Sequence, residues 1–566
     1  MEKQEKFYSF WLKLILLVFL IFSFGEQFWK TCPNKEFLSW DGSSRFVRSL
    51  LNVEAIQTGN LLKLLFLQLE SPTWPFLPSF LTSFFQIFFQ GNRIVELSIG
   101  IFSYSFLLMY FLFKRSSPIG FAVVLLFLPY YTFVFSSMLE IGGGLLFLLS
   151  TIFLQEFFQS DENQESKFSK LAISFYLLGF WKYPYGFLFL GFGLGVFFLK
   201  FLQLSFQAKE SNLQTETNAE IETQIEKRKQ LIQKGKRIFQ NILIPYSLFF
   251  LLNPDRIRST LGTLQFFQTS GFFPGTGEFV PKNYFFYWEV LQKGFFENLG
   301  LVLLCICFLV AILSLWNSIQ KRNLDLNSYL SLQILFLFSV FTFGTNNFQD
   351  RHIYILVPII ALLVENFWVS VVQTFQVNFP KQNFKWLRVS SQIFLGFFVW
   401  VPFFFVPQLV RSADFCFAGF NSDVRDLPHW MEAELERRII VPSVFQNSLP
   451  KVHVNRGEME GILHAIALRN HVKIQFDTKR FQDWNPGYQY IEIGNTCRGF
   501  ETAELDTAQK KNLELEQKQT IIKEKQPNSL EEKVSQHWKP KNSIQIQNPK
   551  PNEWGCIKII SSPIRW

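Results

Sequence analysis

Cysteine and histidine are scarce in this chain, with six of each among 566 residues. Six cysteines are too few for a disulfide scaffold, and Cys305 and Cys307 fall in an apolar segment as small buried side chains. The other four could pair in an oxidising compartment, but the sequence does not assign partners to Cys32, Cys416, Cys497 and Cys556. The histidines near the C-terminus lack the spacing of a zinc motif, so we predict no metal at His429, His453, His464, His471 and His537.

Charged residues are also few, at 17% of the chain, whereas 49% of the residues are hydrophobic and 72 are Phe. The charges are concentrated in a few blocks between apolar runs, a distribution typical of membrane proteins. No stripe of Lys and Arg interleaved with aromatic residues is present, so nucleic acid is not an expected partner. The net charge of +9 therefore indicates orientation in a membrane, with lipids as partners.

A signal-peptide cleavage site is lacking after the first apolar segment, Phe7–Phe24. Gly25-Glu-Gln-Phe-Trp follows it, which predicts a retained helix. With the segments after it, the sequence predicts an α-helical polytopic membrane protein with about eleven transmembrane helices. These later segments are Ile94–Phe113, Phe121–Phe135, Ile141–Phe158, Leu171–Trp181, Phe187–Leu204, Ile238–Leu252, Leu299–Trp316, Tyr329–Phe343, Ile353–Val372 and Ile393–Val406.

The basic residues predict the orientation of these helices. Lys and Arg in short loops favour the cytoplasmic side, so alternate loops should be basic. The pattern fits a cytoplasmic N-terminus, and an odd number of spans then places the C-terminal part outside. The basic loop residues are Lys114, Arg115, Lys167, Lys170, Lys227 to Arg237, Lys321, Arg322, Lys381, Lys385 and Arg388.

The pattern predicts two domains, a transmembrane domain over residues 1–407 and an extracytoplasmic soluble domain over 408–566. The first outer loop, residues 28–93, has apolar residues at helical spacing and predicts two surface helices. The cytoplasmic linker, residues 206–240, is typical of a helix or a disordered segment. Its Lys227, Arg228 and Lys229 fit either lipid-headgroup contacts or ordinary topology-setting charge.

Alternating apolar residues in the C-terminal domain predict a small α/β fold. Strands are expected at Lys473-Ile-Gln-Phe-Asp and Tyr488-Gln-Tyr-Ile-Glu-Ile, and a helix at Met431–Arg438. After residue 503 the sequence becomes rich in Gln, Lys, Glu and Asn, which predicts loose packing or flexibility.

Ionisable residues near a membrane are costly unless they are paired or hydrated, and they often mark functional sites. Four groups fall on the same, outer face in the predicted topology: Asp41, Glu140, Lys182 and the cluster Asp350-Arg351-His352. We therefore expect them to converge on one cavity.

The order of short motifs resembles the GT-C integral-membrane glycosyltransferases of the protein O-mannosyltransferase and aminoarabinose-transferase type. The resemblance covers roughly residues 7–410. The motifs are Trp40-Asp41, Ser71-Pro-Thr-Trp-Pro-Phe-Leu-Pro, Met138-Leu-Glu140, Trp181-Lys-Tyr-Pro-Tyr-Gly and Gln349-Asp-Arg-His-Ile-Tyr-Ile-Leu-Val-Pro-Ile-Ile. Two departures leave the sugar and the use of a divalent metal open. Asp41 is followed by Gly42 where many relatives have a second acid, and His352 stands where an aromatic residue is usual.

The resemblance implies transfer of a sugar from a polyprenyl-phosphate donor to an extracytoplasmic glycan, lipid or protein acceptor, with inversion, in a bacterial inner membrane. Asp41 would be the base that takes the acceptor proton. Arg351, Lys182 and His352 would bind the donor phosphate. Glu140 and Trp40 would contact the substrate, or Glu140 would position Lys182.

Simpler roles stay open at this stage. Asp41 could be a helix N-cap, and Arg351 and Lys182 could be interfacial anchors. Two other functions also use lipid-linked substrates, namely a flippase or transporter and a glycan ligase or polymerase. A transporter should have acids or broken helices near mid-membrane and related halves, whereas this chain has no internal repeat and its charges gather at one face. A ligase usually relies on a large outer loop in the second half.

Overall fold

The computed structural model describes most of the N-terminal two-thirds of the chain and short segments of the remainder. The described residues are 18, 40–69, 75–89, 94–114, 119–134, 139–160, 164–211, 218–259, 261, 284–321, 323–344, 350–378, 434–440, 451–454, 463, 466–467, 472, 474–476, 489–494, 542–547 and 556–561.

The chain divides into two units, one with residues 1–33 and 51–419 and the other with residues 34–50 and 420–566. The sequence instead predicts a boundary after residue 407, with the whole first outer loop in the membrane domain. The difference arises at helix α2 (Trp40–Gln57), whose first part belongs to one unit and whose last part belongs to the other.

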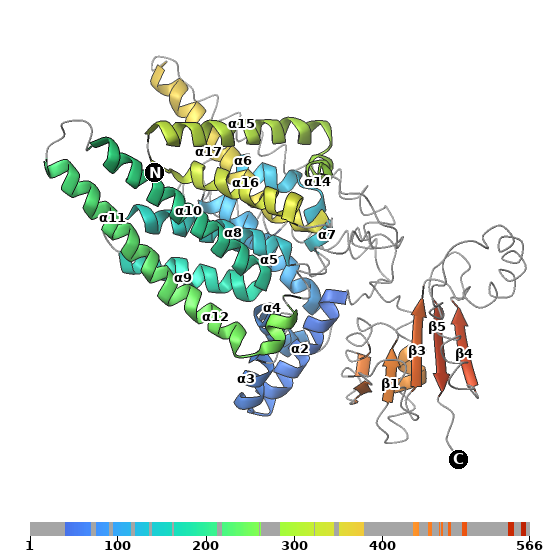
Figure 1. Cartoon of the computed structure of the whole chain (residues 1–566). Coiled ribbons are helices and arrows are strands. Elements are labelled where there is room, and N and C mark those ends of the chain that lie inside the picture. Colours follow the sequence, from blue (N-terminus) through green and yellow to red (C-terminus); the bar gives the residue numbers. More distant parts are fainter. Residues whose placement is uncertain are drawn as a thin grey trace, which may run out of the picture. The chain divides into compact units, whose positions relative to one another are not determined.

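The first unit is helical (Figure 1). After α2 it contains α3 (Leu61–Leu69), α4 (Phe76–Phe89), α5 (Ile94–Lys114), α6 (Ile119–Leu126), α7 (Pro129–Val134), α8 (Glu140–Gln159), α9 (Gln164–Trp181), α10 (Tyr183–Ser211), α11 (Asn218–Ile238), η1 (Phe239–Leu243), α12 (Ile244–Leu251), α14 (Phe286–Gly294), α15 (Asn298–Lys321), α16 (Leu326–Gly344), η2 (Asp350–Leu356) and α17 (Val357–Asn378).

The described residues contain five helical segments that are long and apolar enough to cross a membrane. They lie in α8, α10, α15, α16 and the run from η2 into α17, with mean hydropathies from 1.5 to 2.9. A helix rises about 1.5 Å per residue, so 20 residues reach across a hydrocarbon core of about 30 Å. The protein is thus a helical integral membrane protein.

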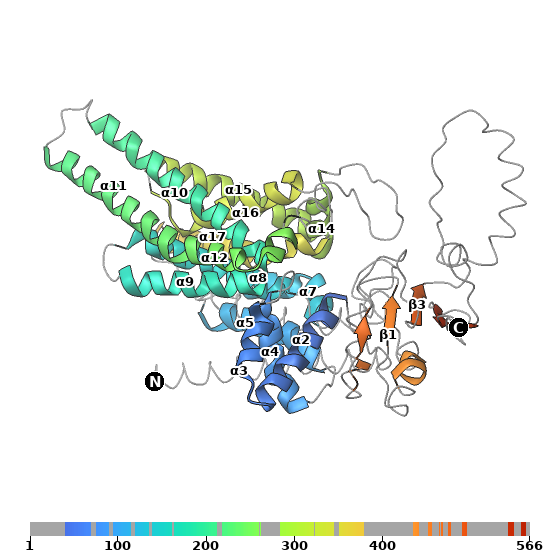
Figure 2. The same ribbon diagram turned by 60° about the horizontal axis from the view of Figure 1, so that its bottom comes forward.

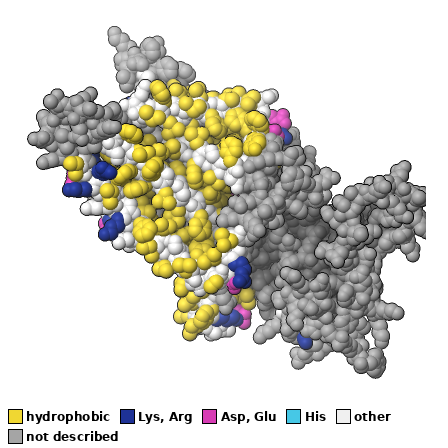
Figure 3. Space-filling model, viewed as in Figure 1, with side chains coloured by type: hydrophobic (Ala, Val, Ile, Leu, Met, Phe, Trp, Pro, Cys, Tyr) yellow, Lys and Arg dark blue, Asp and Glu magenta, His cyan; other side chains and the backbone are white. Residues whose placement is uncertain are grey.

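The surface of the first unit agrees with a lipid environment. Figure 3 shows hydrophobic side chains across one face, with Lys, Arg, Asp and Glu at the edges of that face. On α15, Leu309, Leu313 and Trp316 are each at least half exposed. A patch of this kind would be costly in water and is stable against lipid.

Between the first and the last, the predicted spans coincide with described helices, with one exception. The last span lies outside the described residues, and of the first only Val18 is described. The segment Phe121–Phe135 was predicted as one span, but the structure breaks it into α6 and α7. Pro129 lacks a backbone N–H, and the N–H of Leu128 donates to the carbonyl of Gly294 at 3.0 Å instead of continuing α6.

The described residues of the predicted first outer loop form three helices rather than the two expected from the sequence. Gly59 separates α2 from α3 because it adopts a positive φ of 65°, which side chains rarely tolerate. The Oδ1 atom of Asn60 accepts a hydrogen bond from the N–H of Lys63 at 2.9 Å and so caps the start of α3. Local turn chemistry therefore divides one apolar pattern into two helices.

The second unit contains a five-stranded mixed sheet with strand order β2-β1-β3-β5-β4. Its strands are β1 (Lys451–Val454), β2 (Gln475–Phe476), β3 (Gln489–Gly494), β4 (Asn542–Gln547) and β5 (Cys556–Ser561). Strand β1 runs parallel to β2 and β3, while β5 is antiparallel to both β3 and β4. The strands β2 and β3 fall where alternation predicts them, and β4 lies in the polar stretch for which the sequence predicts loose packing.

A short helix precedes these strands, where the sequence places Met431–Arg438. Within the described residues 434–440 the chain is helical, and η3 covers Glu436–Ile440. Arg437 and Arg438 donate hydrogen bonds to Glu434 at 2.8 and 2.7 Å, and these bonds lower the pKa of the Glu434 carboxyl.

Candidate active site

A buried ion pair joins the start of two membrane helices in the first unit. The ammonium of Lys182 lies 2.8 Å from Oε1 of Glu140, whose side chain is only 1% exposed. Glu140 is the first residue of α8, and Lys182 occupies the break between α9 and α10. The indole N–H of Trp181 donates to the carbonyl of Leu139 at 2.8 Å. The residues that directly precede Lys182 and Glu140 are therefore also joined, which helps to fix the position of the ion pair.

The segment that carries Arg351 and His352 packs against this pair. Both residues belong to the 3₁₀ helix η2, which contacts α8. The charge of Arg351 acts on the Glu140 carboxylate together with that of Lys182, and both cations act on the half-buried His352 imidazole. The structure thus brings together four of the predicted site residues from three distant segments.

Two tyrosines that the sequence analysis did not assign complete this cluster. The ring of Tyr185 lies 5.0 Å from the ammonium of Lys182, and the Glu140 and Arg351 charges both act on its hydroxyl. Tyr130 donates to the carbonyl of Tyr354 at 2.8 Å and also faces the Glu140 charge. Tyr185 was within reach of sequence reasoning, because it belongs to the quoted motif and follows Lys182 by only three residues; Tyr130 gave no such signal.

Two buried oxygen atoms of the described cluster make no hydrogen bond. Among the described residues, Oε2 of Glu140 and the hydroxyl of Tyr185 are buried without a hydrogen-bond partner. Buried polar atoms are normally paired, and unpaired ones in a native structure call for an explanation. A sugar hydroxyl offers both a donor and an acceptor and could satisfy both atoms.

Three consecutive glycines after Glu140 let the neighbouring segments approach α8. A Cβ on Gly142 or Gly143 would clash with the rings of Trp181 and Tyr185 respectively. A Cβ on Gly144 would lie only 3.1 Å from the carbonyl oxygen of Ile355 in η2. Glycine at these positions therefore allows the three charged segments to meet.

We expect Gly143→Ala to displace the Tyr185 ring and to destabilise the protein by about 1–3 kcal/mol, because overpacked cores must shift. Activity should fall with it, since the same ring contacts the Lys182 ammonium. Thermal unfolding of the purified protein in detergent measures the first effect. Gly195→Ala on α10 is the matched control, since nothing lies within 4 Å of a Cβ there. If Gly143→Ala behaves like Gly195→Ala, close packing at α8 is not required.

Trp40 and Asp41 are the first two residues of α2, in the part of the helix that belongs to the second unit. Their side chains lie outside the described residues. The structure shows that Asp41 is in the first turn of a helix, where an acid interacts favourably with the helix dipole. Its role as base stays a prediction.

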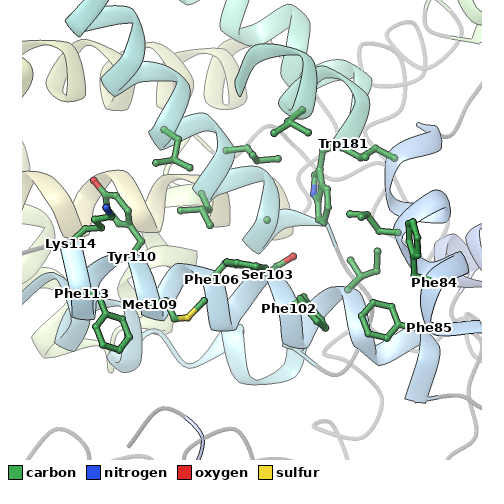
Figure 4. A pocket seen from close by; sticks show the side chains of 18 residues that line it. Phe84, Phe85, Phe102, Ser103, Phe106, Met109, Tyr110, Phe113, Lys114 and Trp181 are labelled. Carbon is green, nitrogen blue, oxygen red and sulfur yellow. The ribbon is translucent and has the colours of Figure 1, made fainter. Parts of the chain in front are cut away.

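A large apolar groove begins beside the ion pair. It has a volume of about 990 Å³ and lies between α4, α5, α8 and α9. Trp181, Phe84 and Phe85 lie at one end, and Tyr110 and Lys114 lie at the other (Figure 4). Gly142 and Trp181 belong to its lining and are near neighbours in sequence of Glu140 and Lys182. The groove is therefore suited to a long apolar chain whose polar end lies near the ion pair.

The chain matches no family model and no curated protein. Two solved structures are similar, both of ArnT from Cupriavidus metallidurans, a protein of the aminoarabinose-transferase type named above. The apo structure is 10% identical with a TM-score of 0.42, covering 87% of this chain and 94% of ArnT. The structure bound to undecaprenyl phosphate is 10% identical with a TM-score of 0.45, covering 96% of this chain and 99% of ArnT.

Metal ligands do not cluster in the part of the chain that the structure describes. No three His, Cys, Asp or Glu side chains gather there as a potential site. The cations that the described site offers to an anionic substrate are Lys182 and Arg351.

Proposed function

We propose that the protein is a membrane glycosyltransferase that takes a sugar from a polyprenyl-phosphate donor and transfers it to an acceptor outside the cytoplasm. The observation that supports this best is the Glu140–Lys182–Arg351 cluster together with an apolar groove whose lining includes Trp181, the residue before Lys182. A lipid-linked sugar has a charged phosphate between an apolar chain and a polar sugar. The charged cluster would bind the phosphate and the sugar, and the apolar groove would bind the polyprenyl chain.

The charges of the cluster suit a phosphodiester. Glu140 contributes one negative charge, and Lys182 and Arg351 contribute two positive charges, so these three side chains together carry a charge of +1. A sugar linked through phosphate to a polyprenol carries one negative charge, and a second develops on the phosphate as the sugar leaves. Fixed cations in a site of low dielectric stabilise this charge without reorganisation.

The proposed reaction is an inverting displacement at the anomeric carbon. The acceptor oxygen attacks from the side opposite the phosphate, the bond between the anomeric carbon and the phosphate oxygen breaks, and both electrons leave with the phosphate. Asp41 takes the acceptor proton, which makes the attacking oxygen a better nucleophile. Glu140 fixes the position of Lys182 through the 2.8 Å ion pair, and its second oxygen is available to a sugar hydroxyl.

The proposed setting is a bacterial inner membrane with the N-terminus in the cytoplasm. The loop charges support this orientation, because basic residues gather on the opposite ends of the helices from Glu140 and Lys182. The active site and the C-terminal sheet would then face the outside.

A deletion strain tests the function directly. We expect the cells to accumulate a polyprenyl-phosphate sugar and to lose one sugar from a surface glycan, because the donor is no longer consumed. Mass spectrometry of lipid extracts and released glycans measures both and identifies the sugar. The same gene expressed from a plasmid should restore both. Accumulation of a larger lipid-linked oligosaccharide on the cytoplasmic side would contradict the proposal and support a flippase, and accumulation outside would support a ligase.

A further inference from the structure

A second pocket lies at the opposite end of the helices that carry the ion pair. It has a volume of about 400 Å³ and lies between the ends of α8 and α10, helix α11 and the turn before α16. Lys200 follows Lys182 by eighteen positions along α10, which corresponds to about 27 Å of helix. The pocket is therefore separate from the proposed active site, and Figures 1 and 2 both show α10 beside α11.

Among the described residues that line this pocket, three are lysines and none is acidic. The lysines are Lys200, Lys227 and Lys234, accompanied by the amides of Gln159, Gln203, Gln230 and Asn323. Lys234 is buried and donates to the carbonyls of Phe158 and Ser160 at 3.2 and 2.6 Å, so it caps the C-terminal end of α8. Its charge remains beside the pocket.

Lys200 has aromatic neighbours, whereas Lys234 donates hydrogen bonds to carbonyl groups. The Lys200 ammonium lies 5.6 Å from the Phe158 ring and 5.7 Å from the Tyr329 ring. Within the described residues it forms no ion pair or hydrogen bond. Placing several cations together in a partly buried pocket is unfavourable unless an anion accompanies them. An anionic ligand with several oxygen atoms would accept hydrogen bonds from the lysines and the amides together.

We propose that this pocket binds a phosphate group, and that an anionic phospholipid headgroup supplies it. A volume of about 400 Å³ exceeds what a phosphate alone needs and falls in the usual range for small-molecule sites, roughly 300–1,000 Å³. Phe198 and Phe206 are exposed elsewhere on α10, the helix that carries Lys200, where lipid acyl chains can contact them. Basic pockets between membrane helices at the cytoplasmic surface are typical headgroup sites.

Binding to the purified, delipidated full-length protein tests this inference. We expect phosphatidylglycerol in mixed micelles to raise the thermal unfolding temperature, and phosphatidylcholine to raise it much less. Lys200→Gln or Lys227→Gln should weaken the phosphatidylglycerol effect about five- to tenfold in concentration, since each lysine contributes one attraction. Lys229→Gln is the matched control, because Lys229 is exposed on the same helix and does not line the pocket.

Further binding experiments with soluble phosphates and with the control variant identify the source of the phosphate. If inorganic phosphate or glycerol 3-phosphate saturates the site and Lys200→Gln abolishes that effect, the phosphate site is supported and its ligand is soluble. If Lys229→Gln weakens the lipid effect as strongly as Lys200→Gln, the attraction is a general surface charge and the inference is wrong. Equal effects of both lipids would also overturn it. Lys200→Gln should raise the unfolding temperature of the lipid-free protein, which shows that the variant is folded.

Discussion

Asp41→Asn should lower the rate of sugar transfer by about 10²–10⁴-fold, the usual contribution of a general base. The amide has nearly the same shape as the carboxylate but cannot accept the acceptor proton. Expression and thermal unfolding should change little, because the lost interaction of the carboxylate with the dipole of α2 is worth only about 0.3–1 kcal/mol. The measurement is release of polyprenyl phosphate from the donor that the deletion strain accumulates.

The matched control for this substitution is Glu54→Gln on the same helix. Glu54 is half exposed and forms an ion pair with Lys63 at 3.0 Å, so its loss removes one carboxylate from α2 with little effect on stability. Transfer should continue at the wild-type rate. If Asp41→Asn also transfers sugar normally, Asp41 is not the base, and a favourable interaction with the dipole of α2 is sufficient to explain it.

The membrane helices could be predicted from the sequence because hydrophobicity over about 20 residues is a strong signal. The break at Phe127 and Leu128 could not be predicted in the same way. It depends on a hydrogen bond from Leu128 to Gly294, which lies far away in the sequence. Gly59 was a local signal for the break between α2 and α3, but apolar spacing alone continued across it.

The clustering of the candidate site residues was predictable in part because charged residues are rare in such a chain. Glu140, Lys182 and Arg351 were conspicuous between apolar runs, and the loop charges placed them on one face. Tyr130 could not be predicted, because one tyrosine among many aromatic residues forms no sequence pattern and only its tertiary contacts distinguish it. The glycines Gly142 to Gly144 belong to the same class, because their value depends on what packs against them.

A loss of activity on substitution of Glu140 or Lys182 could have two causes, because a buried ion pair can be required for folding without acting in catalysis. Removing one partner strands a buried charge, which costs about 3–5 kcal/mol. A single substitution would therefore reduce activity in either case. Replacing both partners separates the two roles, since neither Glu140 nor Lys182 is then left charged without the other.

We expect Lys182→Met to destabilise the protein by about 3–5 kcal/mol and Glu140→Gln by about 1–3 kcal/mol. The asymmetry follows from exposure, since the Glu140 side chain is 1% exposed and the Lys182 side chain is 19% exposed. Lysine can turn its charge toward water, whereas the carboxylate cannot. The double variant should recover most of the stability lost by Lys182→Met. Thermal unfolding in detergent measures all three variants.

Sugar transfer should stay at least about 10²-fold below wild type in the double variant, because a preorganised cation that stabilises the leaving phosphate is still missing. Binding of polyprenyl phosphate should weaken in parallel. Glu165→Gln is the control, since its pair with Arg237 joins α9 to α11 at the surface and should contribute less than about 1 kcal/mol. A stable double variant that transfers sugar at the wild-type rate would show that the ion pair contributes to folding and not to catalysis. Arg351 would then be the remaining candidate cation of the cluster, and its charge alone would have to meet the phosphate.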